Sequence, residues 1–313
     1  MLYGKTITNN KRAKDEYRQT VVISNQYKNK KSVGSGNTIT TKQESEIDTL
    51  EKDCKNHEVT GIQSMKASEE AGMETETFVH VIKSYMKKNK LPVVVKIHHL
   101  YNIFIENELE AYDKLKGFEN SVQKICHFSC MDNMKRWEHM IDSPIGFCQD
   151  NKDPLHFIVL EYIEHGDIYN FFNKLPNKNI ICSFLIQVSL AIAVMAQKYR
   201  ISYNDLNTGN ILIGKTNKTR MHFTVSGQEY RIRSYGITPK FLDYERSHIY
   251  EEEPSMNDIM SDVYSALYKI CLYIKDLELK ETFLKLLKYN TVTKNLVLKD
   301  TIISIRNICT NTQ

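Results

Sequence analysis

The sequence contains little glycine and proline, with 12 Gly and 6 Pro in 313 residues. This scarcity excludes a collagen-like chain and a low-complexity chain rich in these two residues. Tyrosine is abundant, with 18 residues, and 41% of the chain is hydrophobic. We therefore expect a globular protein built from long regular elements rather than a scaffold rich in loops.

The sequence also lacks an excess of one charge and a long hydrophobic run. Lys and Arg number 42 against 38 Asp and Glu, and this formal net charge of +4 is too mild to indicate nucleic acid without a localised basic patch. The longest apolar stretch, residues 184–196, contains Gln187 and Ser189 and is shorter than the ~20 residues of a membrane span. The start of the chain has no apolar segment of signal-peptide type. We expect an intracellular protein that binds neither membrane nor nucleic acid.

The seven cysteines are an odd number and show no paired spacing. Such cysteines are typical of reduced thiols in an intracellular protein. Cys126, His127 and Cys130 offer part of a zinc site as an alternative, but no second pair of ligands follows at the distance of a zinc finger. We therefore expect reduced cysteines and no zinc.

The length allows two domains, or one bilobal domain with a tail, at ~100–200 residues per domain. Residues 1–57 are rich in Lys, Asn, Thr, Ser and Gln, and they contain too few apolar residues to offset the entropy of ordering, which predicts a flexible tail. Gly34 and Gly36 beside lysines suggest a phosphate-binding loop, but no hydrophobic strand precedes them and no helical pattern follows, which favours a linker.

Residues 58–160 and residues 161–313 differ in pattern. In the first part, β-branched and aromatic runs predict strands at residues 62–68, 77–82, 92–97, 145–148 and 157–160. Apolar residues at positions 105, 109, 112 and 115 predict a helix there. In the second part we expect a buried helix at 180–199, a long helix at 262–279, shorter helices at 281–287 and 302–309, and short strands between the two long helices. The fold class is α+β.

Asp205 and Asn210 lie in the string Asp-Leu-Asn-Thr-Gly-Asn, between the buried helix and a strand-like run. Phosphoryl transfer needs such a pair: a carboxylate that accepts the proton of the substrate hydroxyl and an amide oxygen that holds magnesium. Because Asp, Asn and Gly also favour turns for local reasons, a simple Asx-rich turn is an equal alternative.

Three further charged residues fit the same chemistry. Asp243 follows a strand-like run, where a second magnesium ligand is expected, although a strand-ending turn is the alternative. Lys96 interrupts the apolar run Val-Val-Val-Lys-Ile, and a lysine in a half-buried strand needs an anionic partner, which Glu108 on the next helix can supply. The alternative is a lysine on an edge strand, in solvent.

Taken in order, these residues resemble the signature set of protein kinases, which also includes Leu160-Glu161-Tyr162-Ile163 and the helix start Asp262-Val263-Tyr264-Ser265. The string from Asp205 to Asn210 is similar to the Asp-Leu-His-Trp-Gly-Asn of haspin-type kinases, and Asp243-Tyr244 stands where haspin has Asp-Tyr-Thr. The short segment from Asp243 to Asp262 lacks Ala-Pro-Glu, as haspin does. Divergent kinases of large DNA viruses share several of these traits.

This resemblance implies a bilobal protein-kinase-like fold, with a flexible tail at 1–57, a small β-rich N-lobe at 58–160 and a helical C-lobe at 161–313. It implies a serine/threonine protein kinase with ATP and Mg²⁺ as cofactors. The resemblance implies that Asp205 is the catalytic base, and that Lys96 binds the α- and β-phosphates and is positioned by Glu108. It implies that Gly72 lies in the phosphate loop and that backbone groups near Glu161 and Ile163 bind the adenine. It also implies that Asn210 and Asp243 hold magnesium and that Asp262 binds the catalytic-loop backbone.

Several residues depart from the kinase pattern. Tyr203-Asn204 replaces the usual His-Arg, Asn207 replaces a Lys, and Glu245 replaces the Gly after the second magnesium ligand; the phosphate loop, residues 67–73, has a single glycine. The phosphate loop with Glu69 and Glu70, together with Asn207 and Glu245, supports the runner-up, a pseudokinase that serves as a nucleotide-binding or scaffold module. A small-molecule kinase of the aminoglycoside or choline type is a third alternative, against which the hinge string and the helix at Asp262 argue. We expect a monomer that acts on a protein substrate, and acidic residues 251–253 favour a basic peptide.

Overall fold

The structure is a computed structural model that describes residues 59–64, 79–86, 92–98, 103–129, 156–164, 166–174, 176–204, 206–293 and 297–310. All of them belong to one compact unit, Lys42–Gln313. A second unit, Met1–Thr41, lies outside the described residues, as do the expected tail and the expected strand at 145–148.

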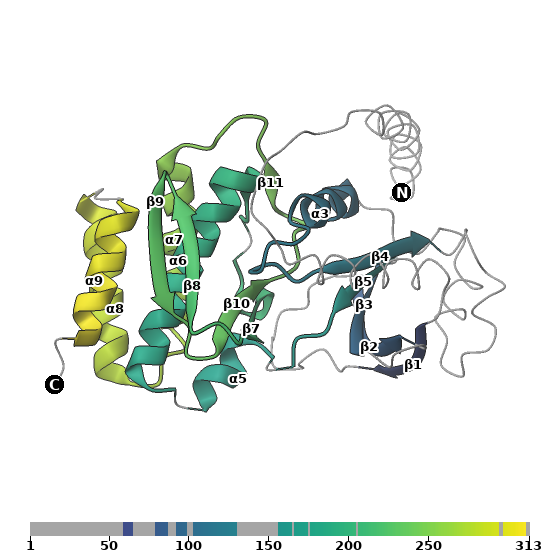
Figure 1. Ribbon diagram of the computed structural model, residues 1–313, viewed down its shortest axis with the longest axis horizontal. Helices are drawn as coiled ribbons and strands as arrows, with labels where there is room; N and C mark the ends of the chain where they lie inside the picture. Colours follow the sequence, from purple (N-terminus) through teal and green to yellow (C-terminus); the bar gives the residue numbers. More distant parts are fainter. Residues whose placement is uncertain are drawn as a thin grey trace, which may run out of the picture. The chain divides into compact units, whose positions relative to one another are not determined.

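The first half of the described chain forms a five-stranded sheet (Figure 1). Its strands are β1 (Val59–Ser64), β2 (Val79–Met86), β3 (Pro92–His98), β4 (Lys124–Ser129) and β5 (His156–Glu161). The order is β1-β2-β3-β5-β4, and every neighbouring pair is antiparallel. Helix α3 (Ile103–Lys114) lies between β3 and β4 in the chain, close to where the apolar spacing predicts it. Strand β4 is absent from the sequence prediction because its Lys, Cys and His interrupt the β-branched pattern.

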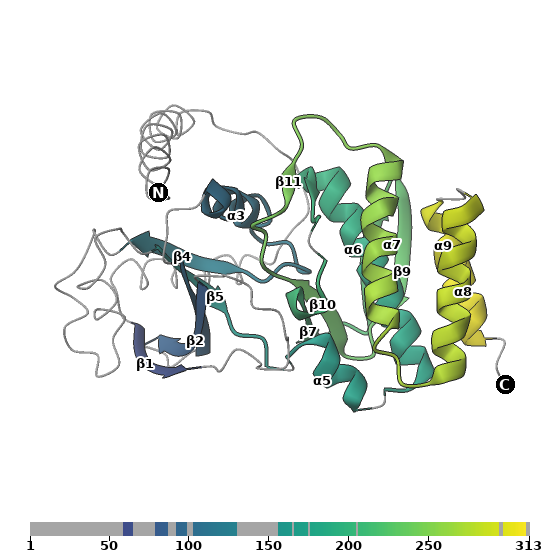
Figure 2. The same cartoon turned by 180° about the vertical axis from the view of Figure 1, so that it is seen from behind.

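The second half is built around helix α6 (Lys178–Tyr199), whose residues 181–196 are all buried. Asn177 caps its start by accepting a hydrogen bond from the backbone N–H of Ile180 at 3.0 Å, and Arg200 ends it with a left-handed φ of 58°. Figure 2 shows the other helices of this half: α5 (Ile168–Asn173), α7 (Met256–Cys271), α8 (Leu277–Thr293) and α9 (Leu298–Thr310). Helices α7 and α9 both pack against α6.

Helix α6 is long and apolar enough to cross a membrane by length and composition. However, 89% of its most apolar window is buried inside the protein. A helix that is apolar on every face and covered by its own chain is typical of a protein core. We therefore interpret α6 as the core helix of this half.

Short strands position the loops between the long helices. Strand β6 (Ile201–Ser202) pairs with β11 (His248–Ile249), and β7 (Ile211–Lys215) pairs with β10 (Ile237–Phe241), both antiparallel. Strands β8 (Arg220–Val225) and β9 (Gln228–Arg233) form a hairpin whose buried face lies on α6. The predicted catalytic string thus lies between β6 and β7, and Asp243 follows β10.

The prediction of a single helix at 262–279 is wrong, because the structure divides this region into two helices. Helix α7 begins six residues earlier, where the Ser255 hydroxyl caps it by accepting from the N–H of Asp258 at 3.3 Å. The helix ends at Cys271, and Asp276 then caps α8 by accepting from the N–H of Leu279 at 3.0 Å. The apolar pattern continues across this break, so it did not reveal the two caps.

Two cysteines that are far apart in the sequence lie next to each other, while the reduced state of the cysteines stays a prediction. Cys182 on α6 and Cys309 on α9 have their Cα atoms 6.4 Å apart, a distance that a disulfide can span. Cys126 is buried on β4. Cys271 is free and buried. Residues 127 positions apart meet because α9 packs on α6, and no local spacing can show this.

Candidate active site

Lys96 lies on β3, in the interior of the five-stranded sheet, with Val81 of β2 and Ile158 of β5 as its cross-strand neighbours. The residue is 7% exposed. This placement decides between the two interpretations of the sequence, because Lys96 is neither on an edge strand nor in solvent. A buried ammonium at this position requires anionic partners.

Three carboxylates surround the Lys96 ammonium. Both carboxylate oxygens of Glu108 lie 2.9 Å from Nζ, which confirms the predicted pairing. Oδ1 of Asp243 lies 2.7 Å away, and Oε1 of Glu245 lies 2.8 Å away. Burial alone lowers the pKa of Lys96, but the negative charges of Glu108, Asp243 and Glu245 outweigh burial and raise this pKa above its ordinary value.

Glu108 lies on α3 and is fully buried. Burial raises the pKa of its carboxyl group, but the ammonium of Lys96 and a hydrogen bond from His98 reverse this effect, so the net pKa is lowered. The carboxylate is therefore held in its charged form. Because the two residues come from β3 and α3, their ion pair fixes the helix against the sheet.

Sequence reasoning missed His98, which is 4% exposed. Its Nε2 lies 3.3 Å from Oε2 of Glu108, and its Nδ1 lies 3.5 Å from Oε1 of Glu245. These three residues offer atoms within 4.8 Å of one another, a spacing that also suits a metal ion. We do not assign a metal to this group, because the Lys96 ammonium already supplies a positive charge to both carboxylates.

The backbone around Asp243 is held from two sides. Asp243 has a left-handed φ of 67°, and its N–H donates to the hydroxyl of Tyr112 on α3 at 3.2 Å. Tyr244 is fully buried, and its ring meets the ring of Tyr112 edge-on with centroids 5.0 Å apart. The side-chain amide of Asn107, also on α3, donates to the carbonyls of Glu245 at 3.2 Å and Ser247 at 2.6 Å. Residues next to Glu108 therefore fix the turn that carries Asp243.

Asp262 is anchored to the start of the predicted catalytic string, as expected. Its Oδ2 accepts a hydrogen bond from the Ser202 hydroxyl at 2.5 Å and from the N–H of Tyr203 at 3.0 Å. Burial raises the pKa of this carboxyl group, and the hydrogen bonds from Ser202 and Tyr203 oppose the rise. Asn204 follows with a left-handed φ of 54°. Asp205 itself lies outside the described residues, so its predicted role as base stays a prediction.

The backbones that carry Asn210 and Asp243 lie side by side. The N–H of Leu242 donates to the carbonyl of Asn210 at 3.1 Å. The hydroxyl of Tyr203 donates to the carbonyls of Leu242 and, at 3.5 Å, of Asn210. Tyr203 is fully buried, and its ring contacts that of Tyr244 with centroids 5.3 Å apart. The residue that replaces the usual His thus packs its ring among the buried aromatic side chains of this site.

The remaining predicted nucleotide contacts lie at the end of β5 or outside the described chain. Glu161 and Ile163 are partly exposed. The Glu161 carboxylate accepts from Lys240 at 2.8 Å and from the N–H of Gln123 at 2.9 Å. The N–H of Glu161 donates to the carbonyl of Gln123 at 3.0 Å. Gly72 lies outside the described residues.

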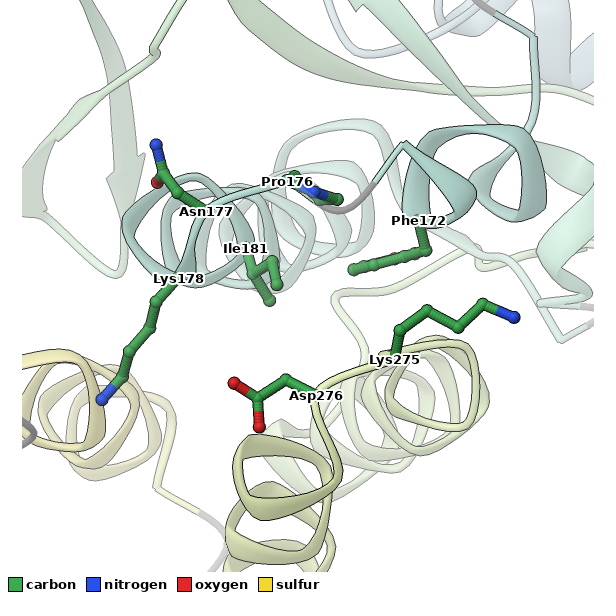
Figure 3. A pocket seen from close by; sticks show the side chains of 7 residues that line it. All are labelled: Phe172, Pro176, Asn177, Lys178, Ile181, Lys275 and Asp276. Carbon is green, nitrogen blue, oxygen red and sulfur yellow. The ribbon is translucent and has the colours of Figure 1, made fainter.

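A separate pocket of about 430 Å³ opens in the helical half (Figure 3). It lies where the start of α6 faces the connection between α7 and α8. Its lining residues are Phe172, Pro176, Asn177, Lys178, Ile181, Lys275 and Asp276. None of them belongs to the predicted site, so the chemistry of the Lys96 cluster does not extend to this pocket.

The chain also matches known proteins. Residues 70–239, just over half of the chain, match the model of the family described as protein tyrosine and serine/threonine kinase. The matched range contains Lys96, Glu108, Asp205 and Asn210 and ends before Asp243.

The chain is also similar to three proteins named serine/threonine-protein kinase haspin or its homologue. It is 29% identical to the mouse (Mus musculus) protein over 165 residues, which are 48% of this chain and 21% of the relative. The Arabidopsis thaliana homologue is 29% identical over 136 residues, 42% of this chain and 22% of the relative. The Drosophila melanogaster homologue is 35% identical over 94 residues, 30% and 16% of the two chains. The matched part thus spans about a fifth of the relatives' length.

Proposed function

Because the chain belongs to the protein tyrosine and serine/threonine kinase family, we propose that it transfers the γ-phosphoryl group of ATP to serine or threonine hydroxyls of a protein. The observation that carries this proposal is the buried cluster in which Lys96 from β3 meets Glu108 from α3 and Asp243 from the turn after β10. Phosphoryl transfer depends mainly on positioning and on charge, and this cluster supplies both. The similarity to haspins favours serine and threonine as the acceptors.

Each residue of the proposed site has a definite task. Lys96, positioned by Glu108, binds the α- and β-phosphates of ATP. Backbone groups of Glu161 and Ile163 hold the adenine. Asp205 orients the acceptor hydroxyl and accepts its proton, which leaves the hydroxyl oxygen free to attack the γ-phosphorus.

The carboxylate of Asp243 and the side-chain oxygen of Asn210 form an all-oxygen donor set, which suits Mg²⁺. Bound there, Mg²⁺ neutralises charge on the phosphate oxygens during the transfer. The hydrogen bond between the Leu242 N–H and the Asn210 carbonyl supports this pairing, because it keeps the two ligands' backbones adjacent. The monomeric state and a basic substrate peptide stay predictions.

The proposal is tested by incubating the purified full chain with radiolabelled ATP, Mg²⁺ and a panel of protein substrates. We expect labelled phosphoserine or phosphothreonine with the wild type and a loss of at least about a hundredfold with Asp205→Asn, since a general base contributes on the order of 10²–10⁴. Asp300→Asn, the same change at an exposed position on α9, is the matched control and keeps the wild-type rate. Undiminished transfer by Asp205→Asn contradicts the assignment.

A pseudokinase is the second candidate, and one observation favours it. Glu245 stands at the position where kinases carry Gly, and its Oε1 lies 2.8 Å from Nζ of Lys96, where it competes with a nucleotide phosphate. A pseudokinase predicts that Mg-ATP raises the melting temperature, because a ligand that binds the folded state stabilises it. It also predicts that no protein or peptide in the panel becomes labelled.

A further inference from the structure

Among the described residues, Glu245 is the one carboxylate in contact with Lys96 to which the proposed function gives no task. Its Oε1 lies 2.8 Å from Nζ, against 2.7 Å for Asp243 and 2.9 Å for Glu108. The ammonium donates hydrogen bonds to both oxygens of Glu108 and to Oδ1 of Asp243, and Glu245 adds a third negative charge in ion-pair contact with it. A phosphate oxygen that binds Lys96 must therefore take the place of a carboxylate.

Glu245 is the carboxylate most easily displaced. Glu108 is fully buried and contacts the ammonium through both oxygens, so its detachment leaves an unpaired charge in the core. Asp243 holds magnesium in the proposed function. The side chain of Glu245 is 23% exposed, and water can solvate its carboxylate once it leaves Lys96.

The contact between Glu245 and Lys96 is nevertheless held in place. The Asn107 amide fixes the Glu245 carbonyl, and the buried Tyr244 ring fixes the preceding residue. Nδ1 of the buried His98 lies 3.5 Å from the same Glu245 oxygen that faces Lys96. The carboxylate thus occupies a defined position in the cluster and is not a mobile surface group.

We propose that Glu245 sets the affinity of this site for ATP by competing with the nucleotide phosphates for the Lys96 ammonium. This inference rests on the proposed function. Two effects act in the same direction: the carboxylate lies in ion-pair contact with the Lys96 ammonium, and its negative charge repels a polyphosphate. The effect is specific to phosphates, so Glu245 weakens the binding of ATP and ADP and leaves the binding of adenosine unchanged.

The test is calorimetric titration of the full chain with Mg-ATP, Mg-ADP and adenosine. In Glu245→Gln we expect the Kd for both phosphorylated nucleotides to fall about fivefold, the range for a part-exposed charged contact. The Kd for adenosine stays the same. Glu245→Asp keeps the charge on a shorter side chain and gives an intermediate Kd for ATP. Glu278→Gln, at an exposed position on α8, is the control for loss of one negative charge and matches the wild type.

Equal or weaker ATP binding by Glu245→Gln overturns the inference, and so does an equal gain in affinity for adenosine. If Glu245→Gln needs a severalfold higher Mg²⁺ concentration than the wild type for half-maximal ATP binding, the inference is also overturned, because Glu245 is then a metal ligand. Phosphate transfer by the wild type tests the proposed function separately. If the wild type binds ATP but transfers no phosphate, the proposed function fails, and tighter binding by Glu245→Gln still supports the inference. If neither protein binds nucleotide, both are overturned.

Discussion

Replacing Lys96 by methionine removes one partner of a buried ion pair and leaves the other. The Glu108 carboxylate is fully buried and then retains only Nε2 of His98, at 3.3 Å. Breaking a buried pair in this way costs ~3–5 kcal/mol of unfolding free energy. The reverse change, Glu108→Gln, costs only ~1–2 kcal/mol, because the Lys96 ammonium keeps Asp243 and Glu245. We therefore expect an asymmetry of at least ~1 kcal/mol between the two variants.

The double variant Lys96→Met/Glu108→Gln separates the ion pair from its surroundings. It contains no unpaired buried charge at these two positions, so we expect it to be destabilised by less than the sum of the single changes, with a coupling of ~2 kcal/mol. The assay is urea unfolding at pH 7, followed by circular dichroism, which gives the unfolding free energy of all four proteins. Equal costs for the two single changes, or an additive double variant, would refute the reasoning.

The pH dependence gives an independent check of the same network. In the wild type the pKa of Glu108 is lowered, so its stabilisation is present above about pH 4.5, the ordinary value, and is lost as the pH falls through the lowered pKa. In Lys96→Met, burial is no longer opposed by the ammonium and raises the pKa of Glu108. The unfolding free energy of this variant should therefore increase as the pH falls from 7 towards 5, while that of the wild type does not.

Two further predictions concern buried groups outside the ion-pair network. Tyr244→Phe removes the hydroxyl that donates to Ser121 Oγ at 2.9 Å, and we expect a loss of ~1 kcal/mol in urea unfolding; an unchanged midpoint contradicts this. Burial raises the pKa of the Cys271 thiol from 9.0 to about 12, so above pH 9 the thiol ionises only in the unfolded chain, and the wild type should lose ~1.4 kcal/mol per pH unit relative to Cys271→Ala. Parallel stability curves for these two proteins between pH 9 and 11 contradict it.

Local sequence patterns predicted most of the elements that carry the site. Strand β3 and helix α3 appear where the β-branched run and the apolar spacing place them, so Lys96 and Glu108 were identified together with their pairing. Asp262 was likewise assigned to the catalytic-loop backbone, which it contacts through Tyr203. These predictions depend on short periodic patterns and on a motif order, both of which a single sequence contains.

Other contacts of the site were not predictable in this way. The positions of His98 and Glu245 around Lys96 depend on the left-handed turn at Asp243 and on how Asn107 holds the following backbone. In the sequence, Glu245 indicated only the loss of a flexible glycine. A contact between residues this far apart in the chain becomes visible when the sheet, α3 and the turn after β10 are packed together.

The few glycines and the many apolar residues determined by themselves that this chain forms long regular elements, and the motif order determined its family. Local conformational preference and periodicity suffice for such conclusions, because each depends on neighbours in the chain. The tertiary structure decided the rest: the burial of Lys96, the three carboxylates around its ammonium, and the proximity of Cys182 on α6 to Cys309 on α9. These features arise from packing between distant segments, which composition and spacing do not encode.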